Sequence, residues 1–217
     1  MINILLKCPL FKNMNEKEII KCIELLNYKI SEYRKDEIIL KNDSIIDRIG
    51  IILSGSVNIE YIDFLGNRTI LSNLSSPQIV GEVYSILNEK LMVDIVSKEN
   101  TKILFINKPN INSCRLDEDL SYIFISNLLT ISLKRNLELS KRSFCVANKT
   151  IRNKISSYLD LISKQKKSNE FDIPFNREQL ADYLNVDRSA LSKELSKMKD
   201  EGLLDYHKYH FIIKKAI

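Results

Sequence analysis

Four polar side chains on one edge of a predicted helix have the chemistry needed to contact nucleic-acid bases: Arg188, Ser189, Ser192 and Lys193. Asp187 stands directly before them, at an N-cap position where its carboxylate can accept free backbone N–H groups. Guanidinium, ammonium and hydroxyl groups all bond to base edges in the major groove of DNA. A recognition helix presents its N-terminal residues in that groove. The spacing therefore predicts a base-reading surface.

A helix-turn-helix would hold these side chains in place. Residues 176–201 read as two amphipathic helices joined by a tight turn, and Val186 fills that turn. Gly202 can adopt the left-handed conformation that ends the second helix. The inner positions of both helices are apolar and recur at helical spacing, namely Leu180, Ala181, Leu184, Leu191, Leu195 and Met198.

The excess positive charge lies in the same part of the chain. Residues 148–217 contain 14 Lys or Arg and 10 Asp or Glu, whereas the other 147 residues contain 19 and 18. Binding to DNA phosphates requires charge of this sign. The excess is modest, and it adds to the helix-turn-helix pattern without identifying a DNA-binding surface by itself.

Length and cysteine usage indicate the broad class of the protein. The 217 residues can form two small domains, each with its own core. The chain has no signal-peptide pattern at its N-terminus and no run approaching the roughly 20 apolar residues of a membrane span. We therefore expect a cytoplasmic protein with no membrane partner. The cysteines are widely scattered, which favours reduced thiols over a disulfide framework: Cys8, Cys22, Cys114 and Cys145.

Short β-rich runs separated by turn signals fill much of the N-terminal half. They are residues 28–33, 37–40, 48–53, 56–62, 68–74, 92–97 and 102–106. Short strands at even spacing predict a β-barrel or jelly-roll. The expected fold is therefore α+β. We assign residues 1–119 to a β-roll sensor domain, 120–147 to a long helix, and 148–217 to a winged helix-turn-helix domain.

The long helix carries a narrow stripe at three- and four-residue steps, formed by Tyr122, Ile125, Leu129, Leu133, Leu137, Ser140 and Phe144. Such a helix often pairs with a copy of itself, which predicts a homodimer held by the first five of these residues. The alternative is that the stripe packs against its own β-roll.

The C-terminal domain should begin with a helix from Asn148 to about Lys164, followed by a short strand around residues 171–174. Residues 203–213 form two β-like arms around a turn, which makes them a candidate wing. The chain's two histidines, His207 and His210, both fall in this wing. We interpret them as a solvated pair near DNA rather than as metal ligands, so no metal site is predicted.

This order of parts resembles the Crp/Fnr family of bacterial transcription regulators over essentially the whole chain. Residues 175–204 carry the most specific part of the resemblance, and residues 50–57 and Gly81-Glu82 support it. The resemblance implies an N-terminal domain like those that bind cyclic nucleotides. It also implies RNA polymerase as a partner, and a homodimer on a two-fold symmetric DNA site whose half-sites lie roughly 34 Å apart.

Site residues carry over from the family position by position. Arg188, Ser189 and Lys193 fall on base-reading positions, and Asn176 and Arg177 fall where members hold backbone phosphate. Many members have Glu in place of Ser189, and a serine is a less selective reader. Many have Arg in place of Lys193, which offers a point charge instead of a planar fork. The family's known half-sites are therefore not expected for this chain.

Departures from the family pattern argue against the usual effector. In cyclic-nucleotide-binding members, Gly-Glu is followed by Arg-Ser or Arg-Thr, and the arginine neutralises the cyclic phosphate. Here residues 89–94 hold no arginine, and none lies between Arg68 and Arg115. A lysine in this segment, Lys90, is better read as a surface residue. Burying a phosphate without a cationic partner costs on the order of several kcal/mol, so binding of cyclic AMP is disfavoured.

Other cofactors also lack their residues. An iron–sulfur cluster needs several converging thiolates, but Cys8 and Cys22 are well separated and no C-x-x-C occurs. Haem would need a histidine in the roll. Two effector candidates remain: Glu82, for which the alternative role is to cap a local turn, and Cys145 as a thiol redox sensor. The other interpretations are a small ligand bound non-classically between the roll and the long helix, and a domain that has lost ligand control.

Two other classes of protein are less compatible with the residues. A cupin-type enzyme needs converging histidines in its roll, and no Walker loop, nucleophile elbow or Gly-rich dinucleotide loop occurs, so no catalytic residue is assigned. A ligand-binding or thiol-redox module acting through protein contacts would usually present apolar anchors on its docking helix. The polar edge at residues 188–193 favours DNA.

Overall fold

The computed structural model describes residues 1–66, 68–108 and 117–215. Cys114 and Arg115, which were named above, lie outside the described residues. The chain divides into two compact units, Met1–Leu133 and Lys134–Ile217, and each is described by itself. In the described part of the chain, no helix combines the length and apolar character needed to cross a membrane.

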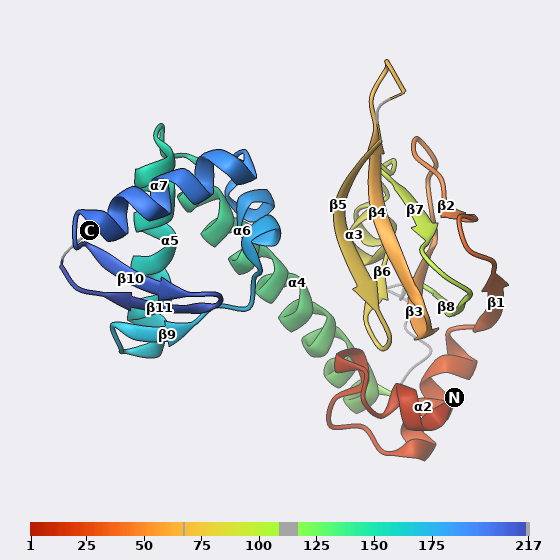
Figure 1. The fold of residues 1–217 in the computed structure, drawn as a ribbon. Helices are drawn as coiled ribbons and strands as arrows, with labels where there is room; N and C mark the ends of the chain where they lie inside the picture. The colour runs from red at the N-terminus through yellow and green to blue at the C-terminus, as the bar shows by residue number, and fades with distance from the viewer. Residues whose placement is uncertain (67, 109–116, 216–217) are drawn as a thin grey trace. The chain divides into compact units, whose positions relative to one another are not determined.

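The first unit contains two four-stranded antiparallel sheets that form the roll (Figure 1). One sheet has the order β1 (Lys29–Tyr33), β8 (Thr101–Asn107), β3 (Arg48–Ser54) and β6 (Ile79–Val80). The other has the order β2 (Ile38–Leu40), β7 (Asp94–Ser97), β4 (Ser56–Ile62) and β5 (Arg68–Ser75). The predicted α+β fold and its run of short strands are confirmed. The two-residue β6 was not predicted.

Helices cover the sheet that contains β3 and β8. They are α1 (Ile2–Leu5), the 3₁₀ helix η1 (Pro9–Phe11), α2 (Glu16–Leu25) and the start of α4 (Glu118–Val146). Along β3, Ile49 and Ile51 pack with these helices, whereas Ile52 packs in a second cluster with residues of the other sheet. Because both faces of β3 are buried, its sequence is continuously apolar rather than alternating.

Two glycines occupy positions that other residues would strain. Gly55, between β3 and β4, has φ +79, and an added Cβ would lie 2.6 Å from the carbonyl oxygen of Asn100. Gly81 has φ +78 and starts the unpredicted helix α3 (Glu82–Leu87), where a Cβ would come within 2.8 Å of Ile46 Cδ1. These backbone requirements explain two of the glycines that carry the family resemblance.

The second unit contains the helix-turn-helix and a three-stranded sheet. Its helices after α4 are α5 (Ile151–Lys166), α6 (Arg177–Leu184) and α7 (Arg188–Asp200). Its strands pair in the order β10 (Leu204–His207), β11 (His210–Ile213) and β9 (Glu170–Asp172). The helix predicted from Asn148 begins at Ile151 because the Thr150 side chain caps it. The predicted apolar positions of α6 and α7 form the core of this unit.

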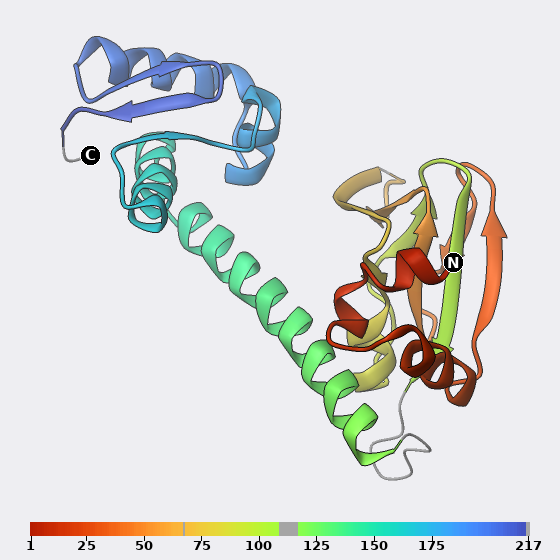
Figure 2. The same ribbon diagram turned by 90° about the horizontal axis from the view of Figure 1, so that it is seen from below.

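Helix α4 is one continuous element that belongs partly to each unit (Figure 2). Its buried side near the roll is formed by Leu120, Phe124 and Leu128 at four-residue spacing. Asn127 adds two hydrogen bonds, from Nδ2 to the carbonyl oxygens of Leu10 and Lys12 at 3.0 and 2.8 Å. The stripe identified from the sequence lies elsewhere on this helix, except for Ile125, which packs at the edge of this core.

Candidate DNA-binding interface

The recognition helix α7 starts at the predicted cap. Asp187 Oδ1 accepts the backbone N–H of Ala190 at 2.8 Å and the hydroxyl of Ser189 at 2.5 Å. The Ser189 hydroxyl and the Ala190 N–H hold the pKa of the Asp187 carboxyl below its ordinary value. The carboxylate therefore stays ionised at neutral pH, and its negative charge stabilises the N-terminal end of α7.

The predicted base-reading residues share one side of α7 but differ in exposure and in the hydrogen bonds that they already make. Arg188, Ser189 and Lys193 are exposed, whereas Ser192 is half-buried. The Ser192 hydroxyl donates to the carbonyl oxygen of Arg188 at 2.9 Å. The Ser189 hydroxyl donates to Asp187, so its oxygen is left as an acceptor. Donor groups facing a base edge would then come mainly from Arg188 and Lys193.

Two residues further along the same edge were missed from the sequence. Ser196 and Lys197 are exposed, and the hydroxyl oxygen of Ser196 lies 3.3 Å from that of Tyr206. Ser196 and Lys197 follow Lys193 by three and four residues, so helical spacing alone could have identified them. They extend the polar edge of α7 toward the strand that carries Tyr206.

An arginine on α5 fixes the recognition helix from its inner side. Arg152 Nε lies 2.6 Å from a carboxylate oxygen of Glu194, and its two terminal nitrogens lie 2.7 and 2.9 Å from those of Glu201. The two carboxylates raise the pKa of the Arg152 guanidinium above its ordinary value. A planar fork that binds both acids sets the orientation of α7 on α5.

The two predicted phosphate-contact residues begin helix α6. Asn176 is its N-cap and forms a reciprocal capping box with Gln179, with both bonds at 2.9 Å. Arg177 is half-buried, and its guanidinium carbon lies 4.9 Å from the ring centroid of Tyr206 and 5.7 Å from that of Phe211. Burial lowers the pKa of Arg177. Its side chain therefore links α6 to the wing.

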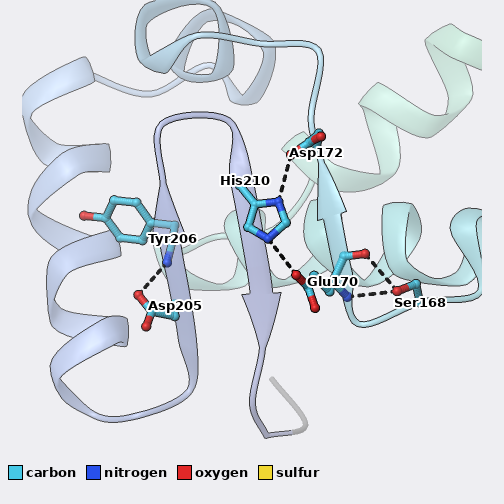
Figure 3. Close-up of polar contacts among 6 residues, drawn as sticks. All are labelled: Ser168, Glu170, Asp172, Asp205, Tyr206 and His210. Atoms are coloured by element: carbon cyan, nitrogen blue, oxygen red, sulfur yellow. Dashed lines mark hydrogen bonds and ion pairs between the residues drawn. The ribbon is translucent and has the colours of Figure 1, made fainter.

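The wing is the hairpin β10–β11 with β9 beside it, and Figure 3 shows the polar contacts across it. His210 on β11 lies between two carboxylates of β9, with Nδ1 2.8 Å from Asp172 and Nε2 3.1 Å from Glu170. On β10, the Asp205 carboxylate lies near two lysines, Lys199 and Lys214, which lower its pKa to about 2. The third strand β9 is thus tied to the hairpin by side chains as well as by its ladder.

We expect the wing to be stabilised at low pH by His210. Its hydrogen bond with Asp172, and then that with Glu170, raise its pKa above the ordinary histidine value of 6.5. A raised pKa in the folded state means that this contribution is fully present below pH 6.5 and is lost as the pH rises through the higher value. An NMR titration of the His210 ring should show a midpoint above 6.5, and Asp172→Asn should lower it. A midpoint at or below 6.5 would contradict the contact.

The stripe predicted for dimerisation is exposed in the single chain. Tyr122, Leu129, Leu133 and Leu137 are 76%, 57%, 59% and 55% exposed. Ile125 is the exception, since it is half-buried and packs at the edge of the roll's helical core. The residues that do face the core are those at 120, 124 and 128. Within the first unit, Tyr122, Leu129 and Leu133 therefore do not pack against the roll as the alternative expected, whereas Ile125 does so in part.

The two effector candidates are both buried. Glu82 is the first residue of α3 and is 2% exposed. Cys145 is fully buried in the core of the second unit, and desolvation raises the pKa of its thiol. A thiol without thiolate character reacts slowly with oxidants. Cys145 has the environment of a core residue rather than that of a redox sensor.

The roll also buries an acidic residue that the sequence analysis did not single out. Glu60 on β4 is 1% exposed, and the Arg68 guanidinium on β5 is ion-paired with its carboxylate. Asp94 stands directly opposite Glu60 on β7 and accepts the N–H of Asn42 at 2.7 Å. Lys90 Nζ lies at the surface, 2.8 Å from Asp43. Arg68 and Lys90 are thus each paired with a carboxylate of the roll, and a phosphate group would have to compete with that carboxylate.

Two family models match this chain. The cyclic nucleotide-binding domain matches residues 30–117, and the Crp-like helix-turn-helix domain matches residues 153–216. The transcriptional activator protein FnrL of Cereibacter sphaeroides is 33% identical over 78 residues, which cover 31% of this chain. The match spans 32%, or about a third, of that relative.

Solved structures share the fold over nearly the whole chain. The catabolite activator protein of Thermus thermophilus is 19% identical, with 96% of this chain and 94% of that chain covered and a TM-score of 0.52. CprK complexed with OCPA is 16% identical, with 92% of each chain covered and a TM-score of 0.60. The c-di-GMP-responsive regulator CLP of Xanthomonas campestris is 18% identical, with 93% and 100% covered and a TM-score of 0.56.

A roll of the cyclic-nucleotide-binding type joined to a winged helix-turn-helix defines a DNA-binding transcription regulator. The chain belongs to the Crp/Fnr family of transcriptional regulators.

Proposed function

We propose that this regulator binds a palindromic DNA site as a homodimer. The observation that carries the proposal is the exposed polar and basic edge of α7, which starts at a capped helix N-terminus. Two copies related by a two-fold axis would place two such helices in successive major grooves, roughly 34 Å apart. In the cell we expect it to act in the cytoplasm and to contact RNA polymerase, as the family resemblance implies.

In this proposal Arg188, Ser189 and Lys193 contact the base edges. Ser192 contributes less because its hydroxyl already donates to a carbonyl oxygen of the same helix. Phosphate contacts fall to Asn176 and Arg177 at the start of α6, where the backbone N–H groups of the helix also favour an anion. Phosphate contacts position the protein on DNA, whereas base contacts select the sequence.

The dimer is proposed to form through the stripe of α4. Exposed leucines at 129, 133 and 137 would be covered by the same residues of a second copy, as in a coiled coil. A two-fold interface uses the same patch on both subunits, which matches the two-fold symmetry of a palindrome.

Control by cyclic AMP, an iron–sulfur cluster or haem is not part of this proposal. Lys90 and Arg68 are paired with acidic residues, so a cyclic phosphate would compete with Asp43 or with the buried Glu60. Burial raises the pKa of the Cys8 thiol to about 11, which disfavours the thiolate that cluster ligation needs. No histidine lies in residues 1–133 of the sequence.

Arg177→Ala tests the phosphate assignment. We expect the slope of log affinity against log salt concentration on random duplex DNA to fall by about one unit, because one phosphate contact is lost. Arg34→Ala, an exposed arginine in the roll unit, is the matched control and should leave the slope unchanged. Lower affinity with an unchanged slope would mean that Arg177 only supports the wing. Absence of DNA binding by the wild type in low salt would contradict the proposed function itself.

A further inference from the structure

The C-terminal end of α6 is held by two cationic side chains from other helices. A helix leaves its last four carbonyl groups without partners inside the helix. At residues 182–185, all four oxygens accept bonds from cations. Arg142 Nη2 and Nε donate to the first two at 2.9 and 3.0 Å, and Lys154 Nζ donates to the last two at 3.2 Å each. Cations here also oppose the negative pole of the helix.

These carbonyls adjoin the turn that leads to the recognition helix. Asn185 has φ +51 in the left-handed region, and the N–H of Val186 donates back to the carbonyl oxygen of Ala181 at 3.0 Å. Asp187, the next residue, caps α7. A change in the positions of the last carbonyls of α6 would therefore change where α7 begins.

Arg142 differs from Lys154 in the helix that carries it. Lys154 is on α5, whose buried face belongs to the same core as α6 and α7. Arg142 is on α4, between Leu137 and Phe144, which are 55% and 64% exposed. Its guanidinium carbon also lies 5.8 Å from the ring centroid of Tyr183. Arg142 therefore joins the helix with the exposed stripe to the helix-turn-helix.

We propose that Arg142 is a positioning residue that couples the packing of α4 to the geometry of the turn at residues 185–187. The inference rests on the proposed function, in which the stripe of α4 pairs with a second copy. When that pairing moves or rotates α4, the planar guanidinium moves with it, and the two bonded carbonyls of α6 follow. Pairing of α4 and ordering of the turn then favour each other, as linked equilibria must.

Hydrogen exchange in the full-length protein tests the coupling. Sedimentation first gives the concentrations at which monomer and dimer dominate, and exchange of the peptide spanning residues 185–187 is then measured at both. In the wild type we expect exchange to be roughly tenfold slower in the dimer than in the monomer. The reason is that the charge-assisted bonds of Arg142 would be lost more often in the monomer, where α4 is unpaired. Arg142→Gln should give the same rate at both concentrations. Arg142→Lys should restore part of the difference.

Lys154→Gln is the matched control, because it removes the same kind of bond from the same helix end without touching α4. Its turn should exchange faster at both concentrations but should keep the dependence on dimerisation. The proposed coupling is wrong if exchange in Arg142→Gln still depends on dimerisation as in the wild type. It is also wrong if exchange in the wild type does not depend on dimerisation. Neither result would contradict the dimer itself. A wild type that stays monomeric throughout would instead contradict the proposed function, and the coupling with it.

Discussion

Leu133→Glu should convert the protein to a monomer and abolish tight binding to its palindromic site. Leu133 is 59% exposed in the single chain and lies in the middle of the α4 stripe. At the proposed two-fold interface, the substitution would bury two carboxylates in an apolar seam, where unpaired charge is strongly unfavourable. Sedimentation should then give the mass of one chain, 25.2 kDa.

The effect on DNA follows from the loss of the second recognition helix. Linked binding modules gain about 10²- to 10⁴-fold in affinity over single ones, so the monomer should lose a factor in this range at its specific site. Leu139→Glu is the matched control, because Leu139 is 65% exposed on the same helix but lies about 120° around its axis from Leu133. If Leu133→Glu remains a dimer, the stripe is not the interface. If both variants dissociate, charge on α4 is unfavourable wherever it lies.

Lys193→Ala should weaken binding at the preferred site by about 1–3 kcal/mol and relax the preference at one base pair. Lys193 is exposed on α7, and an ammonium group can donate to the acceptors on a guanine edge. Lys164→Ala removes an equal charge from an exposed lysine that is paired with Asp160 one turn earlier, and serves as the control. Titration of each variant against specific and random duplexes separates the two effects. Equal weakening on both duplexes would make Lys193 a phosphate contact.

Much of this fold could be predicted from local patterns. The roll strands were recognisable because their residues have high β propensity and turn signals separate them. The cap at Asp187 and the apolar positions of α6 and α7 follow from helical periodicity. Strand β6 and helix α3 were missed because they are short and because α3 starts at a glycine with positive φ.

The parts that could not be predicted depend on tertiary contacts. Helix α4 is apolar on two sides, and only the structure separates the side at Leu120 and Phe124, which packs with the core, from the exposed stripe. In the sequence Arg177 looks like a solvent-exposed cation. In the structure β10 and β11 place the rings of Tyr206 and Phe211 against its guanidinium. The pairing of Glu60 with Arg68 likewise depends on the register of β4 and β5.

The contacts of Arg142 are also beyond local sequence. It precedes its acceptors on α6 by 40 and 41 residues. In the sequence it is one more cation near the end of a long helix, and nothing in its neighbours indicates which carbonyls it would reach.

Selection of DNA fragments on the purified, reduced protein, read by sequencing, tests whether the protein binds a palindromic site as a homodimer. Random duplexes would be incubated with the protein without added effector, and the bound fraction would be amplified and selected again. We expect enrichment of a palindrome whose half-sites are about one helical turn apart. The Leu133→Glu variant should fail to enrich it. Enrichment of a single asymmetric half-site would contradict the proposed dimer, and no retention of DNA even in low salt would contradict DNA binding itself.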